Sequence, residues 1–432
     1  TKALFSSKDY ALYESIRALS IIKEMPNVDQ KELAEAEALV LFNQQNLGAP
    51  SEMALLSRLQ WWSVEYGLIG DINNPKIYGA GLLSSIGESA SCMQPEVKKI
   101  TYTIDALKVG YDITKEQPQL FVTPTFQNLI DVLEQFESTM AYRVGGLESV
   151  SKAIECKNIC TAVFSSGLQL SGVFSKVYTD ANHAIKYINT QGPSSLAFKD
   201  QLIEGHDGNY HAHGFGSPVG KLKDSTKSLE DYNTEDLASA GIIVDHVIAL
   251  AFENGILVEG KLVGQTYMED KLVILSFADC KVTDMEGNVF FEPAWGMFDM
   301  AIGDTIVSVF NGSADKKIFE DQLHISEQPT HQQNYTTKDL HYQSLFKQIR
   351  VYREQGKSDD SLNEIWQQIK NDFKTDWLGT MELLELADTM PTQKALANDL
   401  RTYLNAQSNT YPAYSKLIKD GLKIIDTKLR FE

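Results

Sequence analysis

The feature that most constrains the fold is a hydrophobic pattern that changes its period twice along the 432 residues. Apolar side chains recur at helical spacing over residues 8–25 and 29–47. Over residues 161–178 and 255–310, β-branched and aromatic residues instead alternate with polar ones, as in antiparallel strands. Helical spacing returns from about Lys338 to the end. No single regular architecture accommodates both periods.

The two changes of period predict a multi-domain α+β protein with three consecutive regions. We expect a mainly helical region over 1–144, a β-rich region over 145–335 and a helical region over 336–432. The middle region is expected to form a small antiparallel sheet, sandwich or barrel. Within the first region, the pattern also predicts a short extended run at 118–122 and a helix at 127–136.

The charge balance disfavours two classes of partner. The chain has 39 basic and 58 acidic residues, a net charge of −19. Proteins that bind nucleic acid or anionic membranes through bulk electrostatics need a basic face, so we expect neither partner. The longest apolar run, 241–252, is interrupted by Asp245 and His246 and falls short of the roughly 18 residues of a membrane span. With four scattered cysteines and no leader pattern, we expect a cytoplasmic protein.

Glu65 is a carboxylate on an aromatic helix face. Trp61 and Trp62 precede it by four and three residues, so on a helix they flank it. Removing a carboxylate from water is unfavourable unless it is hydrogen-bonded, paired or bound to a metal. One interpretation is an ion pair with Arg58 or a solvated edge position, and the other is a metal ligand.

The Gly-rich segment 78–88 is expected to form a tight, close-packed turn. Gly79, Gly81 and Gly87 permit a close backbone approach, and Ser84 offers a hydroxyl group beside them. The spacing is not that of a dinucleotide loop, because no βαβ pattern surrounds it. A purely structural role and a role in a site both remain open.

The segment 205–214 is rich in histidine. His211 and His213 would point to the same side of a strand, and His206 or Asp207 could approach across a turn. Such an arrangement could bind a metal, but no spacing rule demands it, and a polar loop rich in His and Gly is the favoured interpretation. The C-x3-C pair at Cys156 and Cys160 is expected to be two buried thiols.

Several strings in the first region occur together in a known family. They are LGAP at 47–50, WWSVEYGL at 61–68, YGAGLLSSIGE at 78–88 and YDITKEQPQLFV at 111–122, with Phe126 just after. In their order and spacing they resemble the pterin-dependent aromatic amino acid hydroxylases, apart from a one-residue difference between the first two strings. The resemblance covers residues 1 to about 140 and is nearest to the long bacterial phenylalanine 4-hydroxylase type.

The resemblance implies a monooxygenase that uses O2, Fe(II) and a tetrahydropterin to hydroxylate an aromatic amino acid, with phenylalanine to tyrosine as the expected reaction. The iron is held by two His and one carboxylate, a set that leaves coordination positions open for oxygen. Glu65 matches the carboxylate ligand. The positions that match substrate-side residues are Trp61, Tyr66, Gly81, Ser84 and Glu88, and those near the pterin are Ser57 and Gln60. Gln60 departs from the aromatic residue or His expected there.

The family's two iron-ligating His are missing from the matching part of this sequence. In the family they come from an H-E-x-x-G-H helix before the region that matches residue 8, whereas the first histidine here is His183. Residues 1–144 therefore resemble the C-terminal part of the catalytic domain, which fits a sequence that starts at Thr1. We predict that this fragment alone is inactive.

A second hypothesis concerns the remainder of the chain. Residues 145–432 show no catalytic constellation and could form a binding or assembly module unrelated to catalysis. Their amphipathic C-terminal helices favour self-association as a homo-oligomer.

Overall fold

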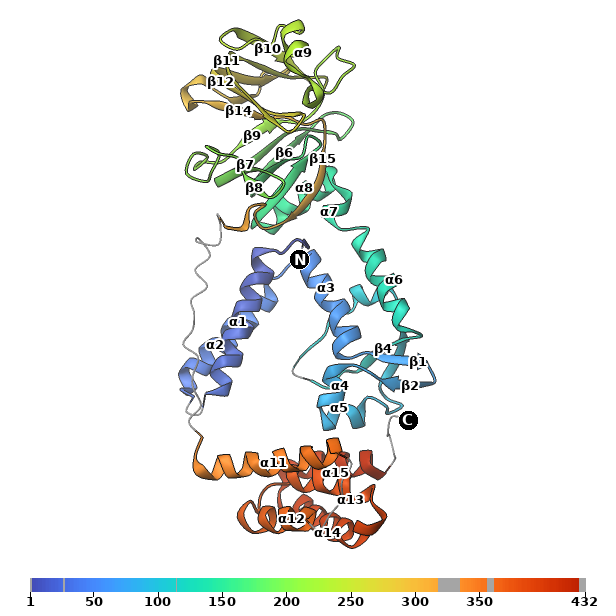
Figure 1. The fold of residues 1–432 in the computed structure, drawn as a ribbon. Coiled ribbons are helices and arrows are strands. Elements are labelled where there is room, and N and C mark those ends of the chain that lie inside the picture. The colour runs from blue at the N-terminus through green and yellow to red at the C-terminus, as the bar shows by residue number, and fades with distance from the viewer. Residues whose placement is uncertain (1, 26–27, 114, 318–334, 356–360, 427–432) are drawn as a thin grey trace. The chain divides into compact units, whose positions relative to one another are not determined.

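Figure 1 shows the protein as a computed structural model, which describes residues 2–25, 28–113, 115–317, 335–355 and 361–426. The chain divides into two compact units. The first unit comprises Thr1–Ser57 and Asp131–Ile325, and the second comprises Arg58–Ile130 and Ser326–Glu432. Each unit therefore joins segments that are distant in sequence. The three consecutive regions 1–144, 145–335 and 336–432 stay a prediction about the sequence.

The first unit opens with two helices that the sequence predicts. They are α1 (Ser7–Glu24) and α2 (Gln30–Gln45). Each begins where a side chain accepts a hydrogen bond from a free N–H of the first turn, Ser6 in α1 and Asp29 in α2. Helix α3 (Glu52–Gln60) follows and runs from the first unit into the second.

The strands of the first unit form two antiparallel sheets, in agreement with the alternating pattern. The six-stranded sheet has the order β15-β5-β6-β7-β8, with β9 paired to β7. The five-stranded sheet has the order β10-β11-β12-β13, with β14 paired to β12. The bounds of the first sheet are β5 (Ile159–Phe164), β6 (Leu168–Thr179), β7 (Ile185–Phe198), β8 (Gln201–Leu202), β9 (Gly216–Pro218) and β15 (Ile306–Asn311). Those of the second are β10 (Val247–Ala251), β11 (Ile256–Met268), β12 (Lys271–Asp284), β13 (Val289–Phe291) and β14 (Phe298–Ala301).

Short helices flank these sheets. They are α7 (Ala141–Val144), α8 (Gly146–Cys156) and α9 (Thr234–Ser239). Helix α6 (Phe126–Glu137), which the sequence predicts, includes the boundary between the two units. Alternate strand residues fill two apolar clusters, one centred on β5 to β7 and one on β11 and β12. Leu4, from the first residues of the chain, is fully buried in the first cluster. Cys156 and Cys160 are buried thiols there, as expected.

The second unit contains a small sheet that the sequence analysis describes only in part. Its order is β2-β1-β4-β3, with β4 parallel to both β1 and β3. The bounds are β1 (Leu68–Asp71), β2 (Asn74–Ile77), β3 (Lys98–Thr101) and β4 (Gln119–Thr123), the last at the predicted extended run. The Gly-rich segment is helical rather than a turn, because α4 (Ala80–Ser84) and α5 (Ile86–Ser91) occupy it.

A helical bundle completes the second unit, as the returning helical period predicts. It consists of α11 (Thr337–Gln355), α12 (Ser361–Asp372), α13 (Leu378–Asp388), α14 (Lys394–Thr410) and α15 (Pro412–Asp426). These helices enclose an apolar core of their own around Trp366, which is fully buried and donates from its indole N–H to Asp399 at 3.0 Å. The mixed α+β class is thereby confirmed. Within the described residues, no helix combines the length and apolarity needed to cross a membrane.

Candidate functional site

The carboxylate at position 65 lies at the end of an unusual helical turn. Helix α3 continues into a π-helical turn, Trp61–Glu65, which closes with a 2.8 Å bond from the Tyr66 N–H to the Trp61 carbonyl oxygen. Single π-turns within helices are frequent at functional sites. Gly67 permits the tight exit, since a Cβ atom there would lie 2.3 Å from the Ser63 carbonyl oxygen.

Trp61 is held in a stack of three aromatic rings. Its ring centroid lies 4.4 Å from that of Tyr66 and 4.3 Å from that of Tyr111, with interplanar angles of 21° and 9°. Both faces of the indole are thus covered. Its Nε1 atom is buried without a hydrogen-bond partner among the described residues. Offset stacks of this kind contribute about 0.5–1.5 kcal/mol per pair beyond the area they bury.

The glycines of the following segment let the backbone pass directly over the π-turn. A Cβ atom on Gly79 would lie 2.5 Å from the carbonyl oxygen of Glu65, and one on Gly81 would lie 2.9 Å from the ring of Tyr66. The glycines therefore have a structural role, because they allow this close packing. The same contact places Gly81 next to Tyr66 and Glu65.

Two carboxylates influence the Tyr66 hydroxyl group. Burial raises the pKa of Tyr66, and the charges of Glu88 and Glu65 raise it further. Burial also raises the pKa of Glu88, and Glu116 adds to the shift. The structure therefore gathers four of the expected site residues, Glu65, Tyr66, Gly81 and Glu88, with Trp61 stacked beside them.

Three other expected site residues make only local contacts. Ser57 donates its hydroxyl to the Met53 carbonyl of its own helix, at 3.0 Å. Ser84 is exposed and donates to the Gly81 carbonyl at 3.2 Å, and Gln60 is exposed. Their assignment to substrate or pterin stays a prediction.

The alternative of an ion pair between Glu65 and Arg58 is not what the structure shows. The Arg58 guanidinium donates to the Leu107 carbonyl oxygen at 2.7 Å. Within the described part of the chain, a single group of three or more His, Cys, Asp or Glu residues has the spacing of a metal site, and Glu65 is outside it.

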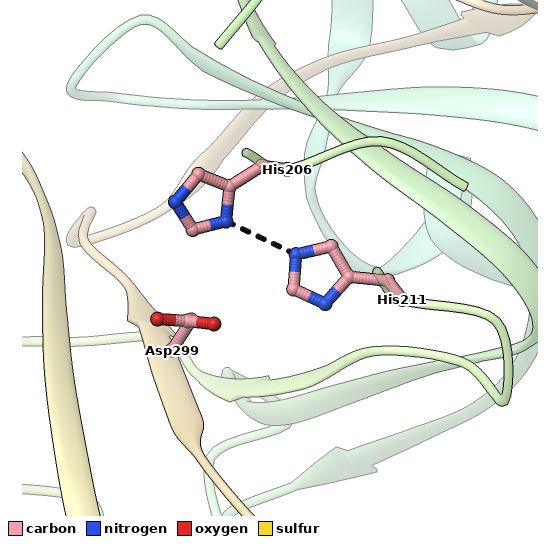
Figure 2. A group of neighbouring side chains, drawn as sticks. All are labelled: His206, His211 and Asp299. Carbon is pink, nitrogen blue, oxygen red and sulfur yellow. Dashed lines mark hydrogen bonds between the residues drawn. The ribbon is translucent and has the colours of Figure 1, made fainter. Parts of the chain in front are cut away.

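That group is His206, His211 and Asp299, in the first unit, and Figure 2 shows the three side chains facing one another. The Nδ1 atom of His206 lies 3.1 Å from the Nε2 atom of His211. Burial lowers the pKa of both imidazole rings, and the Asp299 charge opposes that shift. The two rings are therefore favoured in the neutral form, which is the form that coordinates metals.

The sequence analysis identifies this group only in part. His206 and His211 come together, but His213 is exposed and lies outside the group. Asp207, suggested as their partner, instead accepts the backbone N–H groups of Asn209 and Tyr210 and shapes the loop. Asp299 lies 88 positions beyond His211 on another strand, β14. The only sequence signal for it is an acidic residue within an otherwise apolar strand.

Comparison with known proteins concerns the part of the chain around Glu65. Residues 21–165 match the family model described as biopterin-dependent aromatic amino acid hydroxylase. Phenylalanine-4-hydroxylase of Dictyostelium discoideum is 29% identical over 142 residues, which are 31% of this chain and 32% of that protein. The Homo sapiens enzyme of the same name is 33% identical over 97 residues, 22% of each chain.

A solved structure of Chromobacterium violaceum phenylalanine hydroxylase contains iron(III) and 7,8-dihydrobiopterin. It is 28% identical to this chain, covers 25% of this chain and 43% of its own, and has a TM-score of 0.18. The chain thus spans about a fifth to a third of the length of the curated relatives named above. The match to the biopterin-dependent aromatic amino acid hydroxylase family is thus confined to residues 21–165 of this chain.

Proposed function

We propose that the protein takes part in the hydroxylation of an aromatic amino acid, phenylalanine to tyrosine, with O2, Fe(II) and a tetrahydropterin, and that Glu65 is the carboxylate ligand of the iron. The family match over residues 21–165 supports the reaction class. The observation that carries the role of Glu65 is its place at the end of a π-turn, between a stacked tryptophan and a glycine-lined backbone. Cytoplasmic location remains part of this proposal.

Glu65 does not form an iron site with other described residues of this chain. A mononuclear site of this type needs two His with the carboxylate, and among the described residues no such group includes Glu65. A single carboxylate binds Fe(II) weakly, so the chain alone should be inactive. The reaction requires two imidazoles that this sequence does not place at Glu65.

The contacts of Ser57 and Gln60 do not support their assignment to the pterin site. The Ser57 hydroxyl is engaged with its own helix, and Gln60 faces solvent. What the chain does contribute is a rigid wall. The stack of Tyr66, Trp61 and Tyr111 fixes the Trp61 ring, so a substrate ring would meet its edge unless Tyr111 moved away.

The proposal is tested by comparing the chain alone with a version extended by the residues that its native reading frame encodes before Thr1. Tyrosine formation from phenylalanine, with tetrahydropterin and Fe(II), is the measurement. We expect no turnover by the chain alone, and turnover by the extended protein if the upstream frame encodes the two His.

Substitution in the extended protein then isolates Glu65. Glu65→Gln should abolish both Fe(II) binding and turnover, while Glu96→Gln, an exposed carboxylate of the same unit, should leave both unchanged. Turnover by the chain alone would refute the predicted inactivity. Full activity of the extended Glu65→Gln protein would refute the ligand assignment.

A non-catalytic assembly role for the rest of the chain is supported by one observation. The C-terminal helices have an apolar core separate from that of the sheets. Sedimentation of the full chain is the appropriate test, since a fragment 145–432 would lose Leu4 from the core of the first unit. A strictly monomeric chain would contradict self-association.

A further inference from the structure

The three side chains His206, His211 and Asp299 meet at a junction between the two sheets of the first unit. The loop that carries the two His is fixed to β7, because the N–H of Leu196 donates to the His206 carbonyl and that of Ser194 to the His211 carbonyl. Asp299 comes from β14 of the other sheet. The loop with the two His is therefore anchored to one sheet, and Asp299 is part of the other.

The distances suit a single metal ion. One potential ligand atom from each side chain lies within 4.8 Å of the other two. Ligand atoms at roughly 2.0–2.2 Å from a zinc ion lie about 3–4 Å apart, so shifts of about 1 Å would close the set. As Figure 2 shows, the two imidazoles present ring nitrogens to each other and the carboxylate lies alongside.

The Asp299 carboxylate is buried and is held by hydrogen bonds from two hydroxyl groups. Asp299 is only 5% exposed. Its Oδ1 atom accepts the Ser276 hydroxyl at 2.5 Å, and the Tyr210 hydroxyl is hydrogen-bonded to the same carboxylate. No lysine or arginine is paired with Asp299 among the described residues. Hydrogen bonds from neighbouring groups commonly fix ligating carboxylates in this way.

A cavity of about 620 Å³ adjoins the group. His211 and Tyr210 belong to its wall, together with the rings of Phe290, Phe291 and Trp295. Tyr187 also lines it, is fully buried, and has a hydroxyl group with no partner among the described residues.

We propose that His206, His211 and Asp299 bind one divalent first-row transition metal ion, with a further coordination position directed to this cavity. Two imidazoles and one carboxylate are the donor set of catalytic zinc sites and of mononuclear ferrous sites. Both have a position occupied by water or by a ligand that the metal polarises. The site is separate from Glu65, which lies in the other unit, and does not depend on the proposed hydroxylase function.

The competing explanation is a metal-free hydrogen bond between two neutral imidazoles. In that arrangement one ring nitrogen donates its proton to the other at 3.1 Å, and no ion is needed. The two explanations differ in what happens when a metal is offered, because coordination requires both nitrogens as lone-pair donors.

The test uses the full chain, stripped with a chelator and titrated with Zn²⁺ by calorimetry and with Co²⁺ by visible absorption. We expect one strongly bound ion per chain and ligand-field bands for Co²⁺. Asp299→Asn and His211→Gln, which keep the side-chain volume, should abolish that binding. Ser276→Ala should weaken it about 10- to 100-fold.

Matched variants separate this site from other metal binding. His213→Ala, from the same cavity wall but outside the group, should bind as the original chain does. Glu65→Gln should also bind normally. Circular dichroism and the unfolding midpoint of each stripped variant show whether it is folded. The proposal is judged on whichever of Asp299→Asn and His211→Gln is folded.

Three outcomes would overturn the proposal. One is that the stripped chain binds neither ion. Another is that folded Asp299→Asn and His211→Gln proteins bind as tightly as the original chain. The third is that His213→Ala abolishes binding while Asp299→Asn does not, which would locate the ion elsewhere in the histidine-rich loop.

Discussion

A single buried carboxylate, Glu52, ties together three segments of the first unit. Its two oxygens accept the N–H of Leu4 at 3.1 Å and the N–H of Ala141 at 2.8 Å. The Lys152 ammonium group lies 3.7 Å away and supplies an opposite charge. At the scale of residues, the fold depends on such pairings, because a buried N–H without an acceptor is strongly unfavourable.

Replacing Glu52 by Ala should lower the free energy of unfolding of the first unit by about 2–4 kcal/mol, since two buried N–H groups lose their acceptor. Urea denaturation followed by circular dichroism measures the change. Glu148→Ala is the control, because Glu148 is 70% exposed and also pairs with Lys152, at 3.0 Å. Equal losses in the two variants would show that the ion pair, and not the backbone hydrogen bonds, is responsible.

Gly79→Ala tests the close passage of the backbone over Glu65. Its φ of −63° is suitable for any residue, so the only obstacle is a Cβ atom 2.5 Å from the Glu65 carbonyl oxygen. We expect a loss of about 1–3 kcal/mol from overpacking. Gly110→Ala should be nearly neutral, as nothing lies within 4 Å of a Cβ there. A stable Gly79→Ala protein with unchanged near-ultraviolet dichroism would contradict the close contact.

At the scale of elements, the predictions from sequence succeed where one rule acts alone. The helix 8–25 and the strands of 161–178 follow from periodicity. The prediction of a turn over the Gly-rich segment is wrong, because tertiary packing outweighs the low helix propensity of glycine. Helices α4 and α5 form there, and glycine lets the backbone approach Glu65.

For the candidate sites, too, the sequence predicts only what local pattern determines. The family motif leads to Glu65, Tyr66, Gly81 and Glu88, which do gather in the structure. Asp299 could not be inferred, since its proximity to His206 arises from the pairing of sheets and not from spacing along the chain. Local pattern can identify a residue type, but only the topology identifies its partner.

The entry to α13 provides a prediction about pH. Burial raises the pKa of Asp376, although Tyr342 and the N–H groups of Gly379 and Leu378 donate to it and oppose the shift. A carboxyl group whose pKa is higher in the folded state binds its proton more tightly there. Its contribution to stability is therefore greatest below its ordinary pKa and is lost as the pH rises through the raised value.

Asp376→Asn should consequently flatten the decline in stability of the helical bundle as the pH rises above about 4, the ordinary pKa of Asp. Thermal melts across that range measure the slope, with the exposed Asp372→Asn protein as the reference. A slope identical to that of the original chain would contradict the prediction.

At the scale of the whole molecule, the two units have separate apolar cores. Cooperative unfolding follows a shared core, so we expect calorimetry to resolve two transitions. Trp366→Ala should lower the free energy of unfolding of the second unit by about 3–5 kcal/mol and so shift one transition, while Glu52→Ala shifts the other. If both variants shift a single transition, the two units unfold together.

The first unit joins the first residues of the sequence to strand β15, about 300 residues later, and this has a consequence for biosynthesis. The N–H of Asn311 donates to the carbonyl of Lys2, and Leu4 packs in the same core as residues of β15. A ribosome adding about 5–20 residues per second needs roughly 15–60 s to travel from one partner to the other. Throughout that interval the nascent chain exposes strands whose neighbours have not yet been made, and such unpaired strand edges are open to pairing with other chains.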